Sequence, residues 1–112
     1  MKLNDLKKLG GVVSAAPVQK EITWKKVDES GVEQEYKFTV FVIKHSFGTI
    51  EQIYADKEDR SKAAAFIAKS IRLGEKGEEV LTYEDAYQLE SSLATQFLGA
   101  INEVNGTGKV KN

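Results

Sequence analysis

The sequence predicts an α+β fold, in which an antiparallel β-hairpin or small sheet packs against two to three C-terminal helices. Apolar and polar residues alternate over residues 18–44, around a turn that contains glycine. The second half instead places apolar residues three and four positions apart, as amphipathic helices do. A chain of 112 residues, 41% hydrophobic and 29% charged, has the size and composition of one globular domain. We expect this domain to cover residues 18–106, between a flexible arm at 1–17 and a disordered tail at 107–112.

The arm contains one weak amphipathic turn through Leu3, Leu6 and Leu9. Glycines at positions 10 and 11 are expected to end this turn, and residues 14–17 resemble a linker. Two interpretations remain open, namely a terminus that docks weakly or frays, and an arm that binds a partner.

The hairpin is predicted from two alternating runs, residues 18–27 and 33–44, joined by a turn at residues 28–31. One face of the first run carries Val18, Ile22 and Trp24, with Lys20 as an interruption. In the second run both faces become apolar at residues 40–43, so we expect this end to be covered on both sides, by helices or by another subunit.

The middle of the chain gives weaker signals. Residues 45–50 are expected to form a loop or bulge, and residues 50–54 a short edge strand or a helical turn. Residues 59–73 read as a helix, because Ala63, Phe66, Ile67, Ser70 and Ile71 recur at helical spacing. Gly74 is expected at the position after this helix, where a left-handed conformation is common.

The last third predicts two helices. Thr82 has the character of an N-cap, followed by acidic residues in the first turn of a short helix. Ser91 and Ser92 offer a break or a second cap, and Asn105-Gly106 is expected to close the second helix. The apolar stripe of that helix consists of Leu93, Phe97, Leu98, Ile101 and Val104.

Composition argues against catalysis and against cofactors. The chain has no cysteine and a single histidine, His45, so thiolate and histidine-rich metal sites are excluded. Residues 106–109 lack the upstream glycine and the Ser/Thr of a phosphate loop, and residues 56–67 lack the glycine and glutamate of a calcium loop. His45 could act as a base, but a packing or surface role is favoured for a lone histidine at a strand end. We expect no enzyme, no cofactor and no metal.

Charge is balanced overall but not locally. The net charge is -1, which provides no global field for nucleic acid or anionic lipid. Residues 57–72 hold five basic and two acidic residues, a net charge of +3, whereas residues 75–105 hold one basic and seven acidic residues, a net charge of -6. The apolar run at residues 40–43 is far too short to span a membrane, so a cytosolic protein is expected.

A second class of function stays open at this point. Trp24 lies among Lys20, Lys25 and Lys26, with Tyr36 and Phe38 on the facing run, as in a small nucleic-acid-binding or regulatory protein. Interleaved acidic residues and the absence of net positive charge disfavour this alternative, so no nucleic acid partner is expected.

Four phrases of the second half resemble the tail assembly chaperones of long-tailed bacteriophages and prophages. These phrases are IRLGEKGEE (71–79), LTYEDA (81–86), LESSLA (89–94) and AINEVN (100–105). The resemblance implies a non-enzymatic chaperone in the host cytoplasm that binds the tape measure protein, helps recruit tail tube subunits and is absent from the mature virion. It also implies a longer form made by ribosomal frameshifting, for which the codons of Gly108 and Lys109 are the candidate site.

A chaperone of this kind needs apolar surface for its client or for self-association into a homo-oligomer. Six residues are candidates for protein binding, namely Phe41, Ile43, Phe47, Leu93, Phe97 and Ile101. For the helix stripe at 93–101 a role in the core is the favoured alternative. Phe41 and Ile43 share a face with polar residues and are therefore the better candidates.

Overall fold

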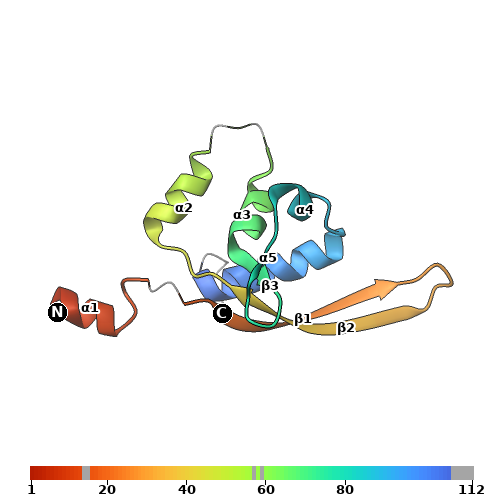
Figure 1. The fold of residues 1–112 in the computed structure, drawn as a ribbon, viewed down its shortest axis with the longest axis horizontal. Coiled ribbons are helices and arrows are strands. Elements are labelled where there is room, and N and C mark those ends of the chain that lie inside the picture. The colour runs from red at the N-terminus through yellow and green to blue at the C-terminus, as the bar shows by residue number, and fades with distance from the viewer. Residues whose placement is uncertain (14–15, 57, 59, 107–112) are drawn as a thin grey trace, which may run out of the picture.

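The computed structural model describes residues 1–13, 16–56, 58 and 60–106 and confirms the α+β class. A four-stranded antiparallel sheet in the order β1-β2-β3-β4 lies against helices α3, α4 and α5 (Figure 1). The molecule is elongated, with α1 at one end and the tip of the β1–β2 hairpin at the other. The elements in chain order are α1 (Leu3–Lys8), β1 (Val18–Val27), β2 (Glu33–Val42), α2 (Phe47–Tyr54), α3 (Lys62–Ser70), β3 (Ile71–Leu73), β4 (Glu79–Val80), α4 (Tyr83–Tyr87) and α5 (Ser91–Asn105).

The predicted hairpin is confirmed over nearly its whole length. Ile22 pairs with Phe38 and Trp24 with Tyr36, so the even-numbered residues of both strands share one face. The turn is built by Asp28, whose Oδ1 accepts backbone hydrogen bonds from the residues at positions 30 and 32. Gly31 has a φ of 84°, a conformation in which glycine is favoured.

The segment after β2 is helical and not a loop. Ser46 caps α2 by accepting a hydrogen bond from the backbone N–H of Thr49, so the helix begins at Phe47. The helical alternative for residues 50–54 is therefore correct, and the loop expected at 45–50 is wrong from Phe47 onward. The sequence obscures this helix because Gly48 and Thr49 both have low helix propensity.

The helix expected at 59–73 is shorter, because its last residues form a strand. α3 begins after its N-cap Ser61 and ends at Ser70, where Ile71 turns to an extended conformation. The backbone N–H of Ile43 donates to the carbonyl of Ser70, and Ile71 then pairs with Val42. Contacts with a distant strand thus terminate a helix that the local pattern would continue.

Strands β3 and β4 form a small hairpin that the sequence pattern did not indicate. Arg72 lies opposite both Phe41 of β2 and Val80 of β4, so β3 is an interior strand of the sheet. Gly74 has the positive φ expected of it, 90°, but in this hairpin connection and not at the end of a helix.

The two C-terminal helices are confirmed. Thr82 caps α4 through a capping box with Asp85. The cap of α5 is Glu90, whose side chain accepts from the backbone N–H of Ser92, and not one of the two serines. Gly106 closes α5 in the left-handed conformation, as expected.

The core lies between the even-numbered face of the β1–β2 hairpin and the helices α3, α4 and α5. Its buried residues come from β1, β2, β3, α3, α4 and α5. Its buried members are Ile22, Val40, Val42, Ala64, Ile67, Ile71, Ala86, Phe97, Ala100 and Ile101. Ala64 and Ala65, rather than Ala63, form the buried side of α3.

Residues 14–15 of the expected linker and the expected tail at 107–112, with Gly108 and Lys109, lie outside the described residues.

Candidate protein-binding surface

Two of the six candidate binding residues lie in the core. Phe97 and Ile101 are each 2% exposed and pack between α5 and the sheet. Leu93, one turn earlier on the same helix, is half-buried and packs against this core. The structure thus places the helix stripe in the core, the role favoured for it above, and not on an accessible surface.

Phe41 and Ile43 are half-buried at the end of β2. Val40 and Val42, on the other face, are completely buried, so the strand end is covered on both sides. The cover over Phe41 comes from the β3–β4 turn, because a Cβ atom at Gly77 would lie 3.0 Å from Cγ of the Phe41 ring. Gly77, with a φ of 75°, allows the turn to approach the ring this closely.

Phe47 is the candidate that the structure exposes, at 78% of its surface. It begins α2, and Ile50 and Tyr54 follow at helical spacing on the same side. We call Phe47, Ile50 and Tyr54 the α2 patch. Tyr54 is 63% exposed and Ile50 half-buried, and all three line an open hollow of about 870 Å³ along α2. The sequence singled out Phe47 alone, since the two partners become neighbours only once the segment is a helix.

A buried residue of α2 and ring contacts with α3 hold the helix on the domain. Ile53 is 3% exposed, and the ring of Tyr54 contacts Phe66 of α3 edge-on with 5.4 Å between ring centroids. The ring of His45, just before the helix, also meets Phe66 edge-on at 6.4 Å. These contacts fix the position of α2 on the domain.

Helix α1 presents a second apolar surface. The helix predicted from Leu3, Leu6 and Leu9 forms over Leu3–Lys8, and none of its residues is buried. Leu3 and Leu9 are 61% and 73% exposed, so the apolar stripe faces away from the core of its own chain. A role of this arm in binding a partner stays a prediction.

His45 connects three elements of the domain. Its ring Nε2 lies 2.7 Å from Oγ of the completely buried Ser70, and its backbone N–H donates to Oδ1 of Asn105 at 2.6 Å. Burial lowers the pKa of His45 below its ordinary value of 6.5, and the positive charges of Arg72 and Lys69 lower this pKa further. The packing role favoured from the sequence agrees with these contacts.

The lowered pKa of His45 predicts a loss of stability in acid. Below pH 6.5 the unfolded chain takes up a proton on His45 before the folded chain does, so the free energy of unfolding should fall as the pH drops through this range. Urea unfolding between about pH 5 and about pH 8 measures the effect. The variant His45→Gln should show a flatter pH dependence, and an unchanged slope would contradict the prediction.

Trp24, the centre of the nucleic-acid alternative, is engaged within the protein. Its Nε1–H donates to Glu90 Oε1 at 3.2 Å and to Ser92 Oγ at 3.0 Å, and its ring packs on Tyr36 with 5.5 Å between centroids. Lys26 lies 5.7 Å from the ring centroid. The indole thus joins the hairpin to the start of α5 beside an acidic side chain, which is a poor environment for a nucleic acid phosphate.

Other classes of site find no support in the described part of the chain. Within residues 1–13, 16–56, 58 and 60–106, no three His, Asp or Glu side chains are grouped so as to hold a metal ion. Among the same residues, none of the helices has the length and apolar character required to cross a bilayer.

Comparison with known protein families gives a match over most of the chain. A family model described as phage tail assembly chaperone matches residues 4–105, which span α1 to the last residue of α5. Neither the curated proteins nor the solved structures contain a significant match.

Proposed function

Because the chain belongs to the phage tail assembly chaperone family, we propose that it binds the tape measure protein through the α2 patch and keeps this client soluble during tail assembly. The family is one of chaperones and not a class of enzymes. The observation that carries the proposal is the 78% exposure of Phe47 on a helix that is itself fixed to the core.

The α2 patch suits a helical client. Exposed apolar side chains that follow one side of a helix can pack against the apolar stripe of a second helix. Glu51 and Gln52 provide a polar border, since both are exposed beside the patch. The hollow along α2 offers room for side chains of the partner.

Phe47→Glu tests this proposal. We expect the variant to fold normally, since Phe47 is exposed and an acidic residue in the first turn of a helix is favourable. Its affinity for the tape measure protein should fall by about tenfold or more, because a central aromatic contact is replaced by a charge. Co-expression followed by isothermal titration calorimetry of purified tape measure segments measures the loss.

Val27→Glu is the matched control. Val27 is 63% exposed, but it lies at the far end of the hairpin from α2. Undiminished binding by Phe47→Glu would exclude the α2 patch as the client site. Equal losses of affinity in both variants would indicate a general effect of the added negative charge and would also exclude the α2 patch as the client site.

The remaining steps of tail assembly belong to the same proposal. We infer that the chaperone also recruits tail tube subunits in the host cytoplasm, associates with further copies of itself, and leaves before the virion is complete. A ternary complex of chaperone, tape measure protein and tail tube protein would support the recruitment step. Mass spectrometry of purified tails should detect no chaperone.

A further inference from the structure

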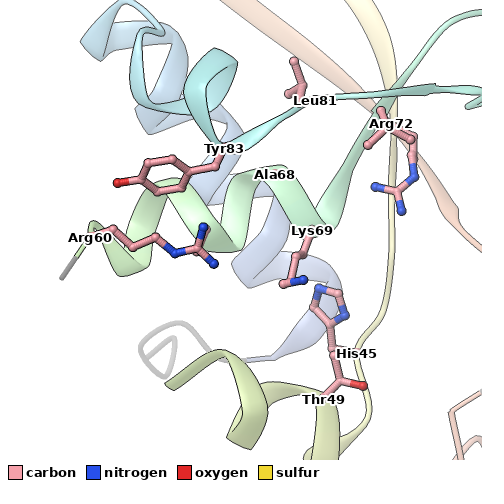
Figure 2. A pocket seen from close by; sticks show the side chains of 10 residues that line it. His45, Thr49, Arg60, Ala68, Lys69, Arg72, Leu81 and Tyr83 are labelled. Atoms are coloured by element: carbon pink, nitrogen blue, oxygen red, sulfur yellow. The ribbon is translucent and has the colours of Figure 1, made fainter. Parts of the chain in front are cut away.

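A second cavity, distinct from the α2 patch, lies between α2, α3, β4 and the start of α4. Its volume is about 460 Å³. Basic side chains enter it from several elements, while Ala65, Ala68 and Leu81 provide apolar wall (Figure 2). No aspartate or glutamate is among its lining residues in the described part of the chain. The polar and charged lining includes His45, Thr49, Arg60, Lys69, Arg72 and Tyr83.

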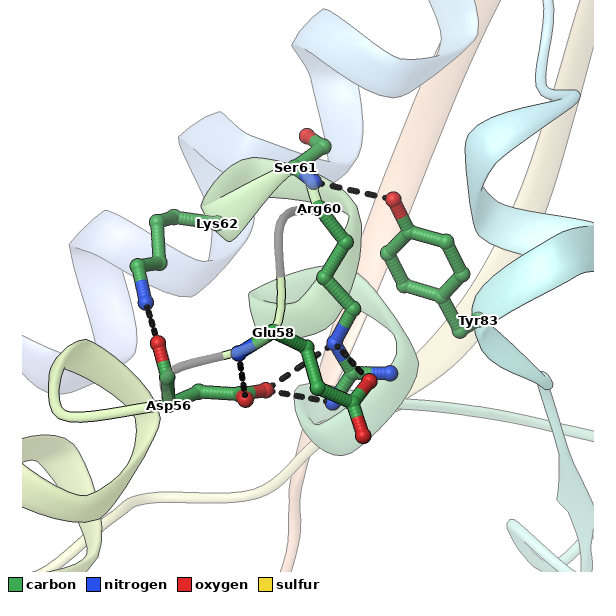
Figure 3. A network of polar contacts seen from close by, with 6 residues as sticks. All are labelled: Asp56, Glu58, Arg60, Ser61, Lys62 and Tyr83. Atoms are coloured by element: carbon green, nitrogen blue, oxygen red, sulfur yellow. Dashed lines mark hydrogen bonds and ion pairs between the residues drawn. The ribbon is translucent and has the colours of Figure 1, made fainter.

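Arg60 already has acidic partners. Its guanidinium group contacts Asp56 at 2.6 Å and Glu58 at 3.4 Å, and it lies 4.9 Å from the centroid of the Tyr83 ring (Figure 3). A backbone hydrogen bond from Glu58 and the side chain of Arg60 hold the pKa of Asp56 below its usual range, so this carboxylate stays charged beside Arg60. The positive charge of Arg60 is therefore compensated within the protein.

Lys69 and Arg72 have no such compensation. Within the described residues neither side chain forms an ion pair, and Arg72 makes only a long contact of 3.5 Å to the carbonyl of Ile71. Figure 2 shows the amino group of Lys69 beside the ring of His45, with the guanidinium group of Arg72 farther away. Burial is the main cause of the lowered pKa of His45, and the positive charges of Arg72 and Lys69 lower this pKa further.

The charge and apolar wall of the cavity, together with the charge of the neighbouring segment, indicate which kind of ligand fits. Uncompensated cations next to apolar wall suit an anion carried on a carbon stem. A nucleic acid would bring many phosphates close to the segment 75–105, whose net charge of -6 would repel them. We propose that this cavity binds the carboxylate of a single glutamate or aspartate side chain of a partner protein, held by Lys69 and Arg72, with the stem against Ala68 and Leu81.

The single histidine allows this inference to be tested on the isolated protein, independently of the tape measure protein. The probe is N-acetylglutamate methylamide, with N-acetylglutamine methylamide as the uncharged control. Nuclear magnetic resonance follows the ring of His45 and the backbone amides during titration. Among the described residues, the charged groups that act on this ring are Lys69 from α3 and Arg72 from β3, while Ser70 and Phe66, which contact the ring, are uncharged.

Saturable shifts should appear around the cavity with the glutamate probe and not with the glutamine probe. The pH midpoint of the His45 signal should rise, because a bound carboxylate favours the protonated ring. Lys69→Gln should weaken binding by about fivefold to tenfold through loss of one charge-assisted contact. Lys25→Gln, which removes an exposed lysine of β1, should leave binding unchanged.

Three results would overturn the inference. The first is an absence of saturable shifts. The second is equal affinity for the glutamate and glutamine probes, or equal affinity of the Lys69→Gln variant and the unmodified protein for the glutamate probe. The third is tighter, Lys69-dependent binding of inorganic phosphate or of a short single-stranded oligonucleotide, which would assign the cavity to free anions or to nucleic acid. A loss of tape measure binding in Phe47→Glu does not affect any of these outcomes, so the two proposals can fail separately.

Discussion

Replacing Phe97 by alanine is expected to lower the free energy of unfolding by about 3–5 kcal/mol. The ring is 2% exposed and meets Phe38 edge-on, with 6.4 Å between centroids, in the layer between α5 and the sheet. Its removal would leave a cavity between the sheet and α5. These two elements cannot both move inward to fill it. This loss is a large part of the stability of a domain of this size.

Urea unfolding followed by the fluorescence of Trp24, the single tryptophan of the chain, measures this effect. Leu93→Ala, on the same helix but half-buried, is the matched control and should cost clearly less. The comparison also decides the role of the α5 stripe. If Phe97→Ala left stability intact and weakened only the binding of a partner, Phe97 would belong to an interface and not to the core.

Replacing Asn105 by alanine is expected to cost about 1–3 kcal/mol, because it leaves partly buried polar groups without a partner. Asn105 Oδ1 accepts from the backbone N–H of His45 at 2.6 Å. Its Nδ2 donates to the carbonyls of Ile43 at 3.2 Å and Ile101 at 3.1 Å. One side chain thus joins the end of α5 to the segment that leaves β2, about sixty residues earlier in the chain.

Hydrogen exchange measures the loss of stability in Asn105→Ala and also shows which part of the protein it affects. The amide of His45 should lose protection in Asn105→Ala, together with the start of α2, while the β1–β2 hairpin keeps its protection. Gln96→Ala, an exposed substitution on the same helix, serves as the control. A variant with native stability and unchanged exchange at His45 would show that the asparagine contacts are unimportant.

The elements predicted correctly are those whose signals are local. The hairpin follows from alternation and from a turn that Asp28 and Gly31 build within a few residues. Helix α4 follows from its capping box at Thr82, and α5 from its apolar stripe and from Gly106. In each case the residues that decide the structure are near neighbours in the chain.

The elements that the sequence did not predict depend on pairing with residues far away in the chain. Ile71 continues the helical spacing of Phe66 and Ile67, yet it is a strand residue because the edge of β2 at Val42 is free to pair with it. The same pairing brings β4 into the sheet. Periodicity cannot reveal such a choice, since the competing hydrogen bonds come from a strand about thirty residues away.

The candidate surface was predicted only in part. Phe47 was named together with Phe41 and Ile43 as candidate apolar surface for a client. Ile50 and Tyr54 were not, although Ser46 as an N-cap followed by apolar residues at helical spacing was a usable signal. The sequence indicated the positive charge of residues 57–72, which include Lys69 and Arg72, but not the cavity. The cavity forms only when α3, β3 and the segment before α2 bring Lys69, Arg72 and His45 together.

Strand β1 lies at the edge of the sheet, and in the described part of the chain its ten residues pair only with β2. An edge of this length is a template onto which other chains can add. Lys25 and Lys26 are exposed along it, and Lys20 is partly exposed beside Glu103. These lysines carry charge that any added strand would have to bury or displace, so they protect the edge of β1 from pairing with the strand of another molecule.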